Sequence, residues 1–255
     1  MKRVLPLFIA AALAASTDAQ VSIGNRIGWS ISHQESDDAE TQKLLETNNN
    51  ALLGMSMGLI LETRIKPFIA AQLEFGLTQK GHQTREAKQD GYSRLRLNYG
   101  EAQFLAKGII GKGPAKLNVL AGISFGRGLV GILRTTNKAV EDSTMNINQG
   151  DTTYAYTYFL DESSSLRDFD EGVENLNRVE WSLVGGLGAS FDLGRSRVFL
   201  EGRYVYGLTS IYNPGKDGVT LPDIFNRSIL INFGYLVQLN DPKSKTPPKP
   251  EAPQY

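Results

Sequence analysis

The chain has 255 residues and is formally neutral, with 27 lysines and arginines against 27 aspartates and glutamates, and it contains no cysteine. Neutrality argues against a nucleic-acid partner, and the lack of cysteine excludes disulfides and a lipidated cysteine. No segment approaches the ~20 consecutive apolar residues that a transmembrane helix needs. If this chain lies in a membrane, it must cross with strands.

Residues 1–20 have the pattern of a secretory signal peptide. Lys2 and Arg3 precede an apolar run from Val4 to Ala15, and small residues then lead to a cleavage position near Ala19 or Gln20. We therefore expect an exported mature chain that begins at about residue 21.

Apolar residues alternate with polar or small residues in eight segments, which is the pattern of β-strands. The segments are residues 21–32, 52–63, 67–79, 94–108, 116–126, 179–193, 197–208 and 227–239. In the fourth segment the alternation changes phase near Gly100, which predicts a β-bulge at Tyr99–Gly100 with Leu95, Leu97 and Tyr99 on the apolar face.

Short and long connections alternate between these segments. Tight turns are expected near Arg64, Ile109 and Gly194, and long polar loops follow the first, third, fifth and seventh segments. The longest connection, residues 129–178, is acidic in its middle, and we expect "LVGILRTT" and "TTYAYTYFL" to extend the strands on either side. Residues 240–255 contain five prolines and predict an extended, disordered periplasmic tail.

The polar face of the strands is rich in glycine and serine and also carries charged residues. This composition suits the narrow interior of an eight-stranded barrel, which its own side chains fill. The apolar face is almost free of charge, as a surface in contact with lipid must be. We therefore predict an all-β, eight-stranded antiparallel up-and-down transmembrane β-barrel over residues 21–239. Its polar lumen network comprises Arg26, Glu62, Glu74, Glu101, Lys107, Glu180, Glu201 and Arg203.

Residues near the ends of the strands fit the same architecture. Trp29, Trp181 and Tyr206 on the loop side, and Phe191 on the turn side, are expected at the membrane interfaces. Asn232, Gly234, Val237 and Leu239 resemble the C-terminal insertion signal of outer-membrane barrels. Short turns on the periplasmic side and long loops outside are typical of such barrels, so the predicted location is the bacterial outer membrane.

The segment "LNYGEAQFLAKG" resembles the PorT-like outer-membrane β-barrel family of Bacteroidota. Tyr99, Glu101, Leu105 and Lys107 match a Tyr-x-Glu-Ile-Pro-x-Leu-x-Lys strand, while Ala102 and Gln103 occupy the Ile-Pro positions. The resemblance implies an integral outer-membrane protein. The secretion and gliding role of the family's namesake is not carried over to this chain.

We expect a non-enzymatic, non-porin barrel with no cofactor and no metal, which presents acidic loops to the cell exterior. Its expected partners are outer-membrane lipid and lipopolysaccharide, the barrel-assembly machinery during insertion, and an envelope protein. Two alternatives remain. A lipid- or peptide-modifying rim enzyme requires His33 or His82 beside a serine or carboxylate, and a soluble lipocalin-like barrel requires an apolar cavity. "DFDEGVEN" from Asp168 hints at calcium, but its loop pattern is incomplete.

Overall fold

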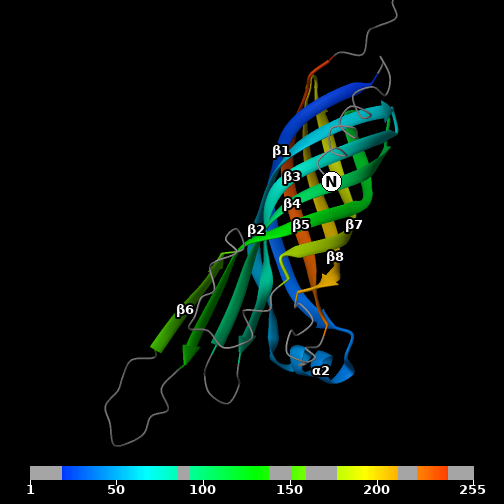
Figure 1. Cartoon of the computed structure of the whole chain (residues 1–255). Helices are drawn as coiled ribbons and strands as arrows, with labels where there is room; N and C mark the ends of the chain where they lie inside the picture. Colours follow the sequence, from blue (N-terminus) through cyan, green and yellow to red (C-terminus); the bar gives the residue numbers. More distant parts are fainter. Residues whose placement is uncertain (1–18, 86–91, 138–150, 159–176, 212–222, 241–255) are drawn as a thin grey trace, which may run out of the picture.

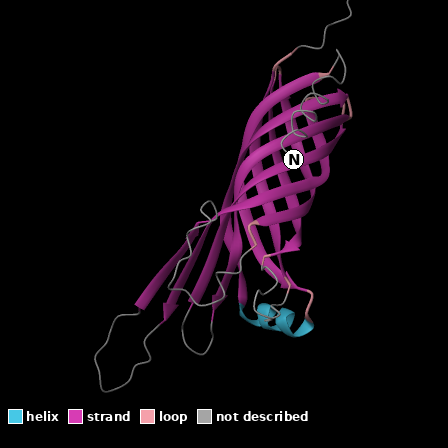
Figure 2. Cartoon of the chain, in the orientation of Figure 1, coloured by secondary structure: helices cyan, strands magenta, loops and turns pink. Residues whose placement is uncertain are grey.

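Antiparallel strands make up most of the chain in the computed structural model (Figure 2), which describes residues 19–85, 92–137, 151–158, 177–211 and 223–240. The described elements are β1 (Gln20–Ser36), α2 (Ala39–Asn48), β2 (Asn49–Lys66), β3 (Ile69–Arg85), β4 (Tyr92–Ile110), β5 (Ala115–Asn137), β6 (Asp151–Tyr158), β7 (Val179–Leu193), β8 (Ser196–Ser210) and β9 (Ile224–Gln238). No helix in these ranges is long and apolar enough to cross a membrane.

Eight of the strands close into a barrel. β1 pairs with β2 on one side and with β9 on the other, from Ser22 opposite Gln238 to Ser36 opposite Ile224. The circuit runs on through β8, β7, β5, β4 and β3, with every pair antiparallel. Because the barrel is closed, the strands form their backbone hydrogen bonds with one another. Lipid could not supply these hydrogen-bond partners. The predicted eight-stranded antiparallel barrel is confirmed.

The three tight turns lie at one end of the barrel, as predicted. They consist of residues 67–68, 111–114 and 194–195. Gly111 and Gly194 have φ angles of 126° and 69°, a region that residues with a Cβ atom rarely adopt. β1 begins and β9 ends at this same end, which is uppermost in Figure 1.

At the opposite end, part of the sheet continues beyond the barrel. β5 extends to Asn137, so "LVGILRTT" does lengthen its strand as predicted. "TTYAYTYFL" does not lengthen β7, because its first seven residues lie in β6, which pairs antiparallel with β5 from Val130–Tyr158 to Asn137–Asp151. In Figure 1 this hairpin leans away from the barrel axis.

The connection between β1 and β2 was expected to be a polar loop, but it contains α2. The Thr41 backbone N–H donates to Asp38 Oδ2 at 2.8 Å, so Asp38 caps the start of the helix. This hydrogen bond holds the pKa of Asp38 below its ordinary value. Ala39, Glu40 and the following Gln, Lys and Leu residues favour helix once the cap is in place.

The predicted bulge at Tyr99–Gly100 is wrong in its position. The ladder irregularity lies on β5, where Asn98 pairs with Val130 and Tyr99 with Gly128, which leaves Leu129 as the extra residue. β4 therefore keeps its phase, and Leu95, Leu97 and Tyr99 are buried rather than exposed to lipid.

The two faces of the wall meet different surroundings. Large apolar residues such as Leu59, Leu187 and Trp29 stay more than half exposed on the outside, although the chain is folded. The inner face is buried and mostly polar, with apolar clusters of Leu105, Leu120, Val184, Val205 and Leu230 and of Ile60, Phe199 and Leu236. Apolar outside and polar inside is the arrangement of a membrane barrel and excludes the lipocalin-like alternative.

The first and last strands of the barrel are joined beyond their ends. β1 begins at Gln20, and residues 1–18 of the predicted signal peptide lie outside the described residues. Asn240, assigned to the tail, accepts a hydrogen bond from the Val21 N–H and donates one to the Ala19 carbonyl, each at 2.7 Å. It therefore joins the last strand to the first; residues 241–255 are not described.

Gly234 and Gly202 provide a matched test of the two faces. A Cβ atom on Gly234, inside the barrel, would collide with the Phe199 ring, whereas one on Gly202, outside, would meet nothing within 4 Å. We expect Gly234→Ala to lower the free energy of unfolding by about 1–3 kcal/mol through overpacking. Gly202→Ala should leave it unchanged. Urea titration in lipid vesicles, read by heat-modifiable gel mobility, measures both; equal effects would contradict this inside–outside assignment.

Candidate functional site

All eight residues predicted for the lumen lie inside the barrel, and none is more than 5% exposed. The alternation of each strand turns these side chains inward, and neighbouring strands bring them to one another. A charge buried without a partner costs several kcal/mol, so the contacts of each group determine whether the interior is stable.

Glu74 forms the centre of the network. Its carboxylate accepts hydrogen bonds from Arg26 Nε at 2.5 Å and from both terminal nitrogens of Arg203 at 2.7 and 2.9 Å. Arg26 also donates to Asn232 and Ser56. Because β3 and β8 are four strands apart in a ring of eight, the Glu74–Arg203 pair crosses the full width of the barrel.

Lys107 and Arg203 carry the network along the interior. Lys107 Nζ lies 2.9 Å from Glu201 and 3.2 Å from Glu62, and Arg203 Nη2 lies 2.6 Å from Glu201. These contacts join β2, β4 and β8. Glu201 is thus shared by two cations, as Glu74 is.

A second cluster lies around Lys80. Its Nζ is 2.7 Å from Glu101 and 2.5 Å from Glu180, and it lies 5.2 Å from the centre of the Tyr99 ring. Thr78 and Gln103 donate hydrogen bonds to Glu101, and Ser182 and Asn226 donate to Glu180.

Sequence reasoning missed Lys80 and Arg197, and both are essential to the charge balance. The predicted set holds three cations and five anions. Adding Lys80, and Arg197 with its 2.5 Å contact to Glu62, gives a set of five cations and five anions in which no residue is more than 6% exposed. The excess of two anions in the predicted set was itself a signal, because a narrow lumen cannot hold uncompensated charge. Both residues also follow the inward alternation of their strands.

The residues that carry the PorT-like resemblance share this interior. Tyr99, Glu101, Leu105 and Lys107 are two, four and two positions apart on β4, so all four face inward and all are buried. Glu101 and Lys107 belong to the ion network, Tyr99 lies beside Lys80, and Leu105 belongs to the apolar cluster.

The predicted interface aromatics lie on the outside. Trp29, Trp181, Phe191 and Tyr206 are all exposed, and Trp181 packs edge-on against Phe125 with ring centroids 4.9 Å apart. Tyr206 lies beneath the Arg227 guanidinium, whose central carbon is 3.7 Å from the ring centre.

The predicted insertion-signal residues divide between the two faces of β9. Asn232 contacts Arg26 inside, and Gly234 leaves room there for the Phe199 ring. Val237 and Leu239 are exposed outside.

The sequence matches the model of the outer membrane protein beta-barrel domain over residues 14–213. The chain belongs to this family. The members of this family are outer-membrane proteins, so this barrel lies in the outer membrane. The apolar outer face of the barrel is therefore the face that contacts lipid.

Several solved barrels are similar to this outer-membrane barrel. OprG from Pseudomonas aeruginosa is 13% identical, with a TM-score of 0.40 over 86% of this chain and 95% of that one. Neisserial surface protein A is 12% identical, with a TM-score of 0.38 over 85% and 96%. Ail of Yersinia pestis, solved with the heparin analogue sucrose octasulfate, is 12% identical, with a TM-score of 0.35 over 85% and 99%. No curated protein matches the sequence.

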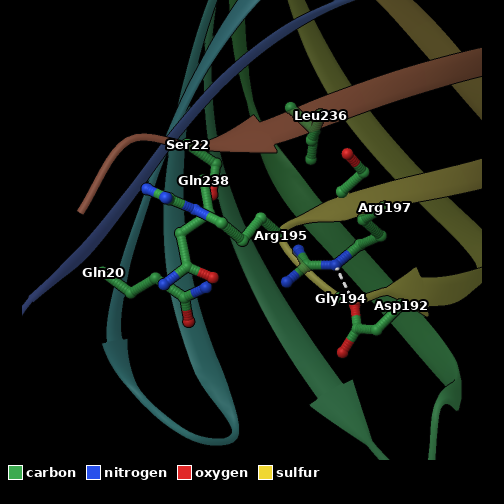
Figure 3. A pocket seen from close by; sticks show the side chains of 9 residues that line it. Gln20, Ser22, Asp192, Gly194, Arg195, Arg197, Leu236 and Gln238 are labelled. Carbon is green, nitrogen blue, oxygen red and sulfur yellow. Dashed lines mark hydrogen bonds and ion pairs between the residues drawn. The ribbon is translucent and has the colours of Figure 1, made fainter. Parts of the chain in front are cut away.

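A small polar cavity of about 60 Å³ lies at the turn end of the barrel (Figure 3). Its lining includes Gln20, Asp192, Arg197 and Gln238, and Arg197 Nε donates to Asp192 at 2.6 Å. Ligand pockets typically measure about 300–1,000 Å³, so this cavity has room for a few waters rather than for an organic ligand.

The two histidines lie on opposite faces of the wall. His33 Nε2 is 3.3 Å from Glu35, whose other oxygen accepts a hydrogen bond from Arg227 at 2.8 Å. His82, like His33, is partly buried. Ser32 and Ser36 donate to the backbone carbonyls of Gly81 and Asp223 instead of to a histidine. The carboxylate required for a rim enzyme is thus present beside His33, without a serine beside it. The "DFDEGVEN" segment lies outside the described residues.

Glu74→Gln tests the centre of the ion network. The amide keeps the shape of the side chain but leaves Arg26 and Arg203 without their shared anion, and we expect the free energy of unfolding to fall by about 3–5 kcal/mol. Glu40→Gln, on the exposed surface of α2, should change it by less than about 1 kcal/mol. Urea unfolding in lipid vesicles compares the two variants. A Glu74→Gln barrel as stable as the wild type would contradict the assigned network.

Proposed function

We propose that this outer-membrane barrel is a non-catalytic, non-conducting anchor that presents an extracellular sheet and acidic loops to another molecule at the cell surface or in an envelope complex. The observation that carries the proposal is the Glu74–Arg203 bridge across the whole lumen. A barrel whose opposite walls are joined by ion pairs has little room for a solute path.

The other ion pairs of the interior also favour a filled lumen over an open channel. Further ion pairs join β3 to β7 through Lys80 and Glu180, β4 to β8 through Lys107 and Glu201, and β2 to β8 through Glu62 and Arg197. Each of these ten charges is paired with an opposite one, so they need no passing ion to neutralise them.

The extension of the sheet provides the proposed contact surface. β6 is the last strand of the sheet order and pairs with β5 within the described residues. Edge strands can accept an extended segment of another protein by main-chain hydrogen bonding. The sequences on either side of β6 are acidic, with Glu141, Asp142, Asp161, Glu162, Asp168, Asp170, Glu171 and Glu174.

The proposal includes membership of the PorT-like group within the outer-membrane barrel family. The inward position of Tyr99, Glu101, Leu105 and Lys107 supports a PorT-like barrel, because these residues form part of the lumen network. In this proposal the partners are outer-membrane lipid and lipopolysaccharide around the wall, the assembly machinery during insertion, and an envelope protein at the extracellular sheet.

Conductance in planar lipid bilayers tests the filled lumen. We expect the wild-type barrel to give no steady channel current at neutral pH. The double variant Glu74→Ala, Arg203→Ala removes both ends of the bridge and should admit ions, provided that heat-modifiable mobility shows it is folded. Steady ohmic current from the wild type would contradict the proposal.

Cross-linking in intact cells tests the extracellular surface. A photoreactive amino acid at the position of Thr153 in β6 should yield a discrete protein adduct, whereas the same group at Lys112, in a turn at the other end, should not yield that adduct. Identical adducts from both positions, or none from Thr153, would count against the sheet as the contact surface.

A further inference from the structure

Exposed cations follow the apolar band at the turn end of the barrel. One lies at each of the three tight turns, within two residues of the last large apolar residue on the outer wall. The cations are Lys66, Lys112 and Arg195, and the apolar residues, in the same order, are Ile65, Ile110 and Leu193. All six residues are exposed, so the lipid-facing surface gives way to positive charge at every turn.

The backbone of the turns fixes the depth of these cations. In two of the turns a single glycine with a positive φ angle, Gly111 or Gly194, separates the apolar residue from the cation. With a rise of about 3.3 Å per residue, a separation of one or two residues places each cation no more than roughly 3–7 Å beyond the apolar residue. The polar layer on each side of a bilayer is about 5–8 Å thick, so the cations lie at the level of the headgroups.

A pair of hydroxyl groups marks the same level on the outer face. The Tyr235 hydroxyl lies 2.6 Å from Ser196 Oγ, and Ser196 directly follows Arg195 in the sequence. Tyrosine is enriched where hydrocarbon meets headgroups, because its ring is apolar and its hydroxyl needs a polar partner. The cation at this turn therefore lies where the outer face becomes polar.

The other cations at this end face the lumen and have partners there. Asp192 is bound by Lys116 and by Arg197, whose Nε lies at 2.6 Å, and Arg64 donates to Gln20 at 3.3 Å. No acidic residue lies in the three turns or directly beside them, and all three turns belong to the described part of the chain. The turns themselves therefore present positive charge alone.

We propose that Lys66, Lys112 and Arg195 bind the headgroups of anionic phospholipids in the periplasmic leaflet of the outer membrane. The carbon stems of lysine and arginine lie along apolar surface while their charged ends reach the headgroups. An anionic membrane surface attracts cations that lie close to it. The inference takes its lipid partner from the proposed function and specifies the headgroup. It does not depend on the conductance of the lumen or on a partner at β6, so each can fail without the other.

Native mass spectrometry of the full-length barrel in detergent tests the proposal, with dioleoyl phosphatidylglycerol as the anionic probe and dioleoyl phosphatidylcholine as the zwitterionic one. The variant Lys66→Gln, Lys112→Gln removes two of the three cations. The control Arg127→Gln, Arg178→Gln removes two exposed cations from the loop end. A further variant, Lys66→Arg, Lys112→Arg, keeps both charges. Heat-modifiable mobility verifies that every variant is folded.

We expect the wild type, the control and the arginine variant to retain phosphatidylglycerol equally. The glutamine variant should retain it about tenfold less, because each exposed cation near an anionic headgroup contributes roughly three- to fivefold. Phosphatidylcholine should be retained weakly by all four proteins. Undiminished retention of phosphatidylglycerol by the glutamine variant, an equal loss in the control, or equal retention of the two lipids by the wild type would overturn the proposal.

Sedimentation with purified peptidoglycan tests the other anionic material that faces this end of the barrel. The wild type and the glutamine variant should sediment with it to the same extent. If the glutamine variant lost peptidoglycan binding and kept its phosphatidylglycerol, the proposal would be overturned, because the cations would then bind carboxylates of the cell wall.

Discussion

Glu74 shows the constraint on which the rest of this barrel depends. Its carboxylate lies in a narrow, water-poor interior and is held by Arg26 from its own side of the barrel and by Arg203 from the opposite wall. Such a group is tolerable only when the cations around it balance its charge and fill its hydrogen bonds. The same requirement, repeated for Glu62, Glu101, Glu180 and Glu201, leads to five cations against five anions.

The two faces of each barrel strand lie in different environments, lipid outside and the packed lumen inside. The outer positions must carry no charge over the lipid band, and the inner positions must be small or mutually paired. Gly234 illustrates how closely the inside is filled, because it leaves space for Phe199. The proposed function therefore uses the ends of the wall, where charged side chains and backbone groups are exposed to water.

Much of this architecture could be predicted from the sequence because a strand has a period of two and a membrane barrel gives each face one environment. The eight segments, the tight turns and the eight lumen charges follow from that alternation alone. Lys80 and Arg197 could also have been found, since the predicted interior lacked two positive charges. They were missed because Lys80 lies one residue beyond the third segment and Arg197 is the first residue of the seventh, where the alternation has little support.

Other features depend on pairing between distant strands. Leu95, Leu97 and Tyr99 are as apolar as lipid-facing residues. Only the pairing shows that β4 keeps its phase, because its ladder with β3 is unbroken and the extra residue, Leu129, lies on β5. β6 was assigned to the wrong strand because "TTYAYTYFL" has strand propensity but carries no information about its partner. α2 was missed although Asp38 and the residues after it form a recognisable capped start.

The central claim is that odd positions of β9 meet lipid while even positions lie in a filled, dry interior. Spin labels on single-cysteine variants test it directly, since the chain has no native cysteine. In lipid vesicles, labels at Ile229, Ile231 and Phe233 should be relaxed by oxygen dissolved in the bilayer, while labels at Ser228, Leu230 and Asn232 should be shielded from both oxygen and a water-soluble nickel complex. Strong relaxation of the even positions by the nickel complex would show a water-filled lumen and would contradict the account.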